Sequence, residues 1–157
     1  MRRVAITGIG TINALGNNVK EFTENLKVAK SGIGQITQFD TENHKVTIAA
    51  EVKNFNPADF MDKKIARRYD RFLQLAIAAS KEAVADSGLE DGPWKENCAV
   101  IVGSGIGGFK TLFGEFEKYA KKGPKIVSPF LIPMMIPDMV SGVVAIEHGL
   151  KGPNFSA

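Results

Sequence analysis

Residues 98–108 read CAVIVGSGIGG, and this stretch decides the fold class. Its first part, Cys98–Val102, is a continuous apolar run, which is typical of a central strand covered on both faces. The glycine-rich part, residues 103–108, leads into 109–120, where apolar residues recur at intervals of three or four. We therefore predict a strand, a tight turn and an amphipathic helix in succession, which indicates an α/β fold.

The glycine turn at 103–108 matches the G-x-G-x-x-G pattern of dinucleotide-binding sites and lies between a strand and a helix, as that pattern requires. A ribose-binding acidic residue is expected about 20 residues later at the end of a second strand. This chain has an amphipathic helix and lysines there instead. A turn that lets backbones or an acyl chain pass closely is the better interpretation, so we expect no cofactor. A dinucleotide-binding domain remains the alternative, and a thermal-shift screen with nicotinamide and flavin cofactors would test it.

Outward from this stretch, the pattern predicts further elements toward the N-terminus. We expect a short buried strand at 4–6 and a helix over 19–29, with Asn18 as its N-cap and Gly32 as its C-terminal glycine. Alternation over 46–52 predicts an extended strand, compatible with a hairpin. A long helix over 64–87, ended by Gly88, has an alanine-rich face on which another segment can pack closely.

The C-terminal part is dominated by apolar residues. Ser128–Ile136 is apolar almost throughout and contains Pro133, which prevents a long regular helix. So dense a methionine-containing segment should be buried, either in the core or against a partner chain. Asp138 is expected to cap a helix that reaches His148 and ends at Gly149.

Composition limits the class of protein. The 157 residues suit one domain, and a net charge of +3 with interspersed acids and bases does not indicate nucleic-acid binding. No apolar stretch approaches the roughly 18 residues of a membrane span, and the apolar run after Arg3 is too short for a signal peptide. We therefore expect a cytoplasmic protein that contacts neither nucleic acid nor membrane.

The chain offers no catalytic set. Cys98 is the single cysteine, so an internal disulfide and a cysteine-cluster metal site are excluded, and an inert core thiol is expected. His44 lies in a polar stretch typical of a solvated loop, and His148 closes a helix. No Cys–His or Ser–His–Asp arrangement follows from their spacing, so we assign no catalytic residue and no metal ligand.

One cluster of charge stands out. Residues 63–71 carry five basic residues and one acid. A solvated helix surface is the commonest reason for such a cluster, and a docking patch for an acidic partner is the alternative. Lys121, Lys122 and Lys125 would extend the patch if the fold brings them near it.

Taken in order, seven short motifs resemble bacterial β-ketoacyl-acyl-carrier-protein synthase II. They are Val4–Gly10, Ser31–Ile33, Phe39–Asp40, Asp86–Leu89, Gly103–Gly108, Ser128–Phe130 and Gly149–Pro153. The resemblance implies an α/β, thiolase-like fold, of which residues 1–157 are the incomplete N-terminal half of five α-β-α-β-α layers with a mixed sheet. It also implies a homodimer that condenses malonyl-carrier protein with an enzyme-bound acyl group, in a decarboxylative Claisen reaction of fatty acid elongation. The closely related synthase I stays open, as does the acyl chain length.

The resemblance also assigns residues. It implies an acyl-substrate site and, on the basic cluster, a docking site for acyl carrier protein. The acyl-substrate site consists of Gly105, Ile106 and Gly107 together with Leu131, Ile132 and Met135. The last three belong to the segment Ser128–Ile136, through which the resemblance implies that the dimer forms. The docking site consists of Lys64, Arg67 and Arg68.

The family's catalytic cysteine and histidines fall beyond Ala157, so we expect these 157 residues alone to be inactive and either poorly soluble or tightly paired. We expect the face with Met139, Val140, Val143, Val144 and Ile146 to be among those left uncovered. The alternative is a non-catalytic ketosynthase-like partner subunit (a chain-length factor) or a carrier-protein-binding fragment. The residue at the nucleophile position would distinguish them.

Overall fold

The computed structural model describes residues 3–157 and divides into two compact units. The first unit takes in the described residues up to Asn56 together with Ala79–Gly88, and the second comprises Pro57–Ala78 and Leu89–Ala157. Helix α3 (Arg71–Asp86) therefore contributes its N-terminal half to the second unit and its C-terminal half to the first. No helix in the described part of the chain is long and apolar enough to span a membrane.

The first unit contains helix α1 (Val19–Lys27) and an antiparallel pair of short strands, β1 (Ile33–Gln35) and β2 (Ile48–Ala50). The strand predicted over 46–52 is confirmed as the shorter β2, and its antiparallel partner β1 was not predicted. The N-cap of α1 is also confirmed, because the Asn18 side chain accepts a hydrogen bond of 2.8 Å from the backbone N–H of Glu21. Gly32 does not end this helix; Ala29, with φ of 53°, makes the left-handed turn soon after Lys27.

The predicted buried strand at 4–6 is wrong. Val4 and Ile6 are 95% and 86% exposed, and in the described part of the chain no strand pairs with them. The following glycines run along α3 instead, where a Cβ added to Gly8 would lie 2.2 Å from the carbonyl oxygen of Ala83. The alanine-rich face of α3 therefore does allow the close approach that the sequence predicts.

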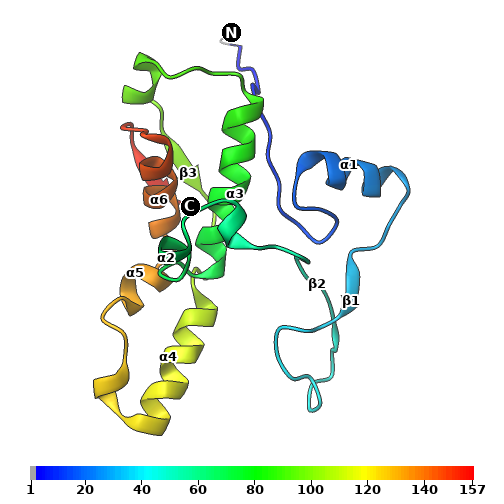
Figure 1. The fold of residues 1–157 in the computed structure, drawn as a ribbon, viewed down its shortest axis with the longest axis vertical. Coiled ribbons are helices and arrows are strands. Elements are labelled where there is room, and N and C mark those ends of the chain that lie inside the picture. Colours follow the sequence, from blue (N-terminus) through cyan, green and yellow to red (C-terminus); the bar gives the residue numbers. More distant parts are fainter. Residues whose placement is uncertain (1–2) are drawn as a thin grey trace. The chain divides into compact units, whose positions relative to one another are not determined.

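The second unit holds the principal core and a parallel pair of strands, β3 (Val100–Val102) and β4 (Asn154–Ser156) (Figure 1). Its helices are α2 (Lys63–Ala66), α4 (Phe109–Lys122), α5 (Leu131–Met135) and α6 (Met139–His148), with the 3-10 turns η1 (Pro57–Asp59), η2 (Pro93–Glu96) and η3 (Pro124–Ile126). The predicted strand, glycine turn and helix over 98–120 are thus confirmed as β3 and α4, although β3 begins only at Val100.

The core of this unit forms where α3 and α6 meet. Leu73 and Ile77 of α3 pack with Val140 and Val143 of α6, and all four are at most 3% exposed. A second cluster joins β3 to α6 through Val100, Val144 and Ala145. The expectation that the apolar face of α6 stays uncovered is therefore wrong for Val140, Val143 and Val144.

Three further expectations differ from the structure. The long helix over 64–87 is interrupted between Ala66 and Arg71, because Asp70 accepts a hydrogen bond from the N–H of Phe72 and starts α3 anew. Strand β3 is not covered on both faces, since Ile101 is 60% exposed. Asp138 precedes α6, but its carboxylate accepts from the Ser156 N–H of β4 instead of capping the helix.

Candidate functional site

The glycine turn packs directly against α5. The Gly108 N–H donates a hydrogen bond of 2.8 Å to the carbonyl oxygen of Met135, and Gly107 has a positive φ of 74°. A Cβ on Gly107 would lie 2.3 Å from the Met135 oxygen, and one on Gly108 would lie 2.4 Å from the Met134 oxygen. The glycines thus let two backbones pass closely, which confirms the interpretation of residues 103–108 as a close-approach turn.

The six residues predicted to bind the acyl chain lie on this turn and on α5. Gly107 and Met135 are brought into contact, as their backbones show. Ile106 and Ile132 are 67% and 57% exposed, and a Cβ on Gly105 would meet nothing within 4 Å. Leu131 is half-buried. Two apolar side chains of this set are therefore largely exposed and two, Leu131 and Met135, are half-buried, and the role of the set stays a prediction.

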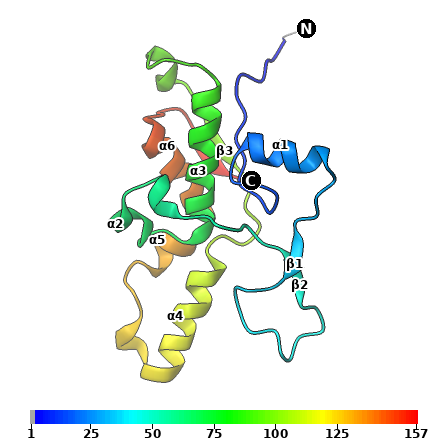
Figure 2. The ribbon, with the colours of Figure 1, turned by 45° about the vertical axis from the view of Figure 1, so that its right-hand side comes forward.

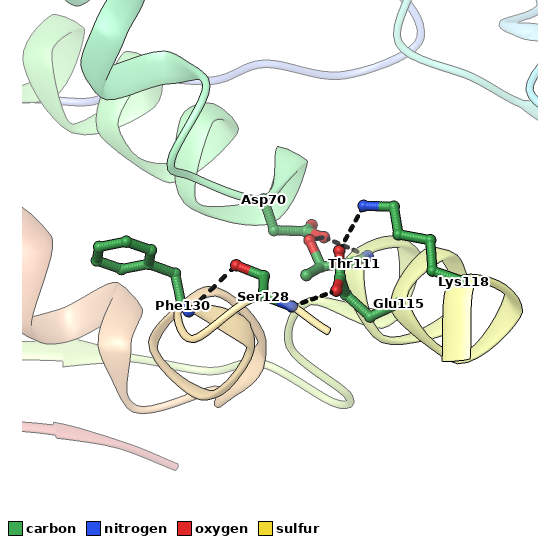
Figure 3. A network of polar contacts seen from close by, with 6 residues as sticks. All are labelled: Asp70, Thr111, Glu115, Lys118, Ser128 and Phe130. Atoms are coloured by element: carbon green, nitrogen blue, oxygen red, sulfur yellow. Dashed lines mark hydrogen bonds and ion pairs between the residues drawn. The ribbon is translucent and has the colours of Figure 1, made fainter. Parts of the chain in front are cut away.

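A network of buried acids lies beside the turn (Figure 3). Asp70 and Glu115 are each 7% exposed. One carboxylate oxygen of Asp70 accepts hydrogen bonds from both the N–H and the hydroxyl of Thr111, at 2.8 and 2.6 Å. Glu115 accepts from the Lys118 ammonium group at 2.6 Å and from the Ser128 N–H at 2.7 Å. These bonds tie α4 both to the start of α3 and to the segment that precedes α5.

The charge of Glu115 is stabilised by its donors. The hydrogen bond from Lys118, followed by that from the Ser128 backbone, holds the pKa of this carboxyl below its ordinary value of 4.5, against the opposing effect of burial. Glu115 lies at a polar position of the helical pattern of 109–120, so nothing in the sequence indicated that it is buried.

A polar hollow opens next to this network. It has a volume of about 360 Å³ and is lined by α3, by α4 and by the turn that precedes α3, including Tyr69, Arg71, Gln74, Lys110 and Lys118, with Met134 of α5. Most of its lining residues are charged or polar, unlike the apolar residues expected to bind an acyl chain. The hollow and the predicted acyl site are therefore neighbouring but chemically different features.

The predicted docking residues lie at and just after α2. Lys64, Arg67 and Arg68 are all exposed, and Asp62 caps the helix by accepting a hydrogen bond of 2.7 Å from the Lys64 N–H. The Arg68 guanidinium carbon lies 5.7 Å from the centre of the Phe130 ring, within cation–π range. The C-terminal end of α4, which carries the lysines of 121–122, points away from α2 in both views, so it does not extend the patch (Figures 1 and 2).

The remaining candidates for chemistry stay apart. His44 is exposed in a loop, 5.4 Å from the Phe39 ring between centroids, and His148 is the last residue of α6. Cys98 is free and half-buried just before β3, not within a strand as expected. Among residues 3–157, no group of three or more histidine, cysteine or acidic side chains is placed to hold a metal ion.

Comparison with known proteins identifies the relatives of this chain. It is 48% identical over 154 residues to 3-oxoacyl-[acyl-carrier-protein] synthase 2 of Staphylococcus aureus strain N315, and 41% identical to the protein of that name from Synechocystis. Each alignment covers 98% of this chain and 37% of the relative. The chain thus spans little more than a third of the length of these relatives.

Comparison with solved structures points to the same group of proteins. A structure described as the ishigamide ketosynthase/chain length factor superposes with a TM-score of 0.90 at 32% identity, covering 99% of this chain and 40% of that one. A β-ketoacyl synthase from Burkholderia phymatum gives 0.76 at 26% identity, covering 97% and 38%. The predicted α/β, thiolase-like fold class is confirmed. The family model described as "Beta-ketoacyl synthase, N-terminal domain" matches residues 1–157, and the chain therefore belongs to the β-ketoacyl synthase family.

Proposed function

We propose that the protein is a β-ketoacyl-acyl-carrier-protein synthase of fatty acid elongation, an acyltransferase that condenses malonyl-carrier protein with an enzyme-bound acyl group. The observation that carries this proposal is the 48% identity to 3-oxoacyl-[acyl-carrier-protein] synthase 2 over 98% of the chain. Residues 1–157 would then form the incomplete N-terminal domain of this cytoplasmic enzyme and supply its docking and acyl-binding surfaces.

The acyl chain would lie along the turn and α5. Ile106 and Ile132 expose apolar side chains there, and covering such surface is worth about 25 cal/mol per Å². The segment Ser128–Ile136 also leaves Phe130 50% exposed. A second copy of the protein would cover this segment, so we propose a homodimer formed through it, with Leu131, Ile132 and Met135 closing the partner's acyl site.

Acyl carrier protein is the proposed partner of the basic patch. Lys64, Arg67 and Arg68 lie within about two turns of one another and are all exposed. Exposed positive charges of this kind raise the rate at which an acidic partner associates, and salt weakens the effect. The patch ends at Arg68, whose side chain reaches Phe130 next to the acyl site.

Under this proposal, the condensation itself would use residues outside 1–157. A condensing enzyme needs an activated nucleophile with a base or a helix N-terminus nearby. Cys98 lies before a β-strand, and the side chains of His44 and His148 are on other segments. We therefore propose that residues 1–157 alone are inactive.

A second function follows from one relative. Because the chain superposes with a TM-score of 0.90 on a structure described as a ketosynthase/chain length factor, a non-catalytic partner subunit is the other candidate. Such a subunit would use the same turn and α5 to line an acyl site without forming an acyl-enzyme.

The test is condensation by the intact protein. Acyl- and malonyl-carrier protein are supplied, and released carbon dioxide and β-ketoacyl product are measured, with residues 1–157 alone as the control. We expect product from the intact protein and none from the control. No product from the intact protein alone, but product when it is mixed with a ketosynthase that is inactive by itself, would favour the partner subunit. No product in either case would refute both functions.

A further inference from the structure

The basic patch and the acyl-binding turn are joined by one buried side chain. Asp70 lies two residues after Arg68, and Figure 3 shows its carboxylate directed at Thr111 of α4. It accepts three hydrogen bonds, from the N–H of Phe72 at 3.3 Å and from the N–H and hydroxyl of Thr111 at 2.8 and 2.6 Å. One carboxylate therefore holds the first turns of both α3 and α4.

Helix α4 depends on this contact because it lacks a cap of its own. Its N-cap residue is Gly108, which has no side chain to accept from the free N–H groups of the first turn. Thr111 is the third residue of the helix, and its N–H is one of those free donors. Asp70 accepts it from another segment, and a charged acceptor makes the stronger kind of hydrogen bond.

The start of α4 also fixes the turn before it. A Cβ on Gly108 would lie 3.2 Å from the Asp70 Cβ and 2.7 Å from the Met135 Cα. The turn is therefore packed between Asp70 on one side and Met135 of α5 on the other. The bond from the Gly108 N–H to the Met135 oxygen completes the connection. A displacement of Asp70 would therefore be passed to Gly108 and to the neighbouring Ile106.

The other side of Asp70 is equally fixed. The Gln74 side-chain amide donates to the carbonyl oxygens of Ala66, at 2.8 Å, and Tyr69, at 3.0 Å, and so holds the end of α2 and the turn after it against α3. Arg68 reaches Phe130 from the same turn. The patch and the acyl-binding turn are thus connected by short, well-satisfied contacts.

We propose that Asp70 is a positioning residue, which holds the turn at 103–108 in place relative to the docking patch and thereby sets the acyl chain length that the enzyme accepts. This inference rests on the proposed condensing activity. It assigns Asp70 no contact with substrate; its effect is transmitted through Thr111 and Gly108 to Ile106.

Four variants of the intact protein test the positioning role of Asp70. Asp70→Asn removes the charge and part of the accepting capacity, and Thr111→Val removes only the hydroxyl bond. Thr111→Ser keeps that hydroxyl and should restore wild-type behaviour. Asp62→Asn is the matched control, because it likewise removes the charge of a helix-capping carboxylate, but one whose hydrogen bonds go to the N–H groups of Lys64 and Ile65 in α2. Thr111→Val is the milder change and keeps the test valid if Asp70→Asn fails to fold.

The readout is the ratio of kcat/KM for a short and a long saturated acyl-carrier protein. We expect Asp70→Asn to change this ratio at least about fivefold, the lower end of typical coupling between sites, with a smaller change of the same sign for Thr111→Val. Asp62→Asn should leave the ratio unchanged. An equal loss of activity for both chain lengths, or no change, would overturn the proposal.

Hydrogen exchange separates this result from failure of the proposed function. If the wild type does not condense, the proposed function fails, but the exchange rates of the Gly108 and Thr111 amides still measure the positioning. Faster exchange in Asp70→Asn than in Asp62→Asn would support the role of Asp70. Equal rates in the two variants would refute it.

Discussion

Replacing Gly108 with alanine should destabilise the protein because the new methyl group has no space. Its Cβ would lie 2.4 Å from the Met134 oxygen, about 1 Å closer than an ordinary contact. Forcing such an atom into packed structure costs about 1–3 kcal/mol. The lower entropy of the unfolded chain offsets about 0.4–1 kcal/mol of this cost, so we expect a net loss in the range of about 0–2.6 kcal/mol, with a middle value of about 1.3 kcal/mol.

The matched control is Gly105→Ala in the same turn. A Cβ there meets nothing within 4 Å, so this variant should be neutral or more stable by up to about 1 kcal/mol. Urea unfolding of the intact protein measures both, through the shift in midpoint at an unchanged slope. Equal stability of the two variants would refute the close contact between the turn and α5.

Three further outcomes are expected. Leu73→Ala, at a fully buried side chain, should cost about 2–5 kcal/mol in urea unfolding, whereas the half-exposed Leu89→Ala should stay within about 0.5 kcal/mol. Because the pKa of Glu115 is lower in the folded than in the unfolded protein, its charge stabilises the fold at pH values above the ordinary 4.5, and this stabilisation is lost as the pH falls through the lower pKa of the folded state. Glu115→Gln should therefore flatten the acid side of a plot of the urea midpoint against pH, and an unchanged plot would contradict this. Lys64→Ala should raise the KM for carrier protein about two- to fivefold, less at high salt, and an effect insensitive to salt would exclude docking by charge.

Local patterns predicted the parts of the fold that depend on near neighbours. The cap of α1 by Asn18 involves a residue three positions away, and the close approach at Gly107 and Gly108 follows from their lack of side chains. Helix α4 was predicted from its own apolar spacing. In each of these cases the physical cause lies within a few residues of the element, so the sequence alone contains it.

The remaining features depend on distant partners. Asp70 breaks a helix that periodicity extends across it, and its bond to Thr111 joins residues 41 positions apart. The run at 4–6 has strand composition but no strand to pair with in the described residues. Neither buried acid was predicted as part of the site, because the residues around an acid in the sequence do not indicate which distant N–H groups will reach it.

Locating the acyl group on the intact protein tests the central proposal most directly. The protein is incubated with acyl-carrier protein and digested, and the acylated peptide is identified by mass spectrometry. We predict one acyl group, carried by a cysteine outside residues 1–157, while Cys98 stays unmodified. An acyl group on Cys98, or no acylation of the intact protein, would contradict the proposal that this chain supplies docking and acyl-binding surfaces to a nucleophile located elsewhere.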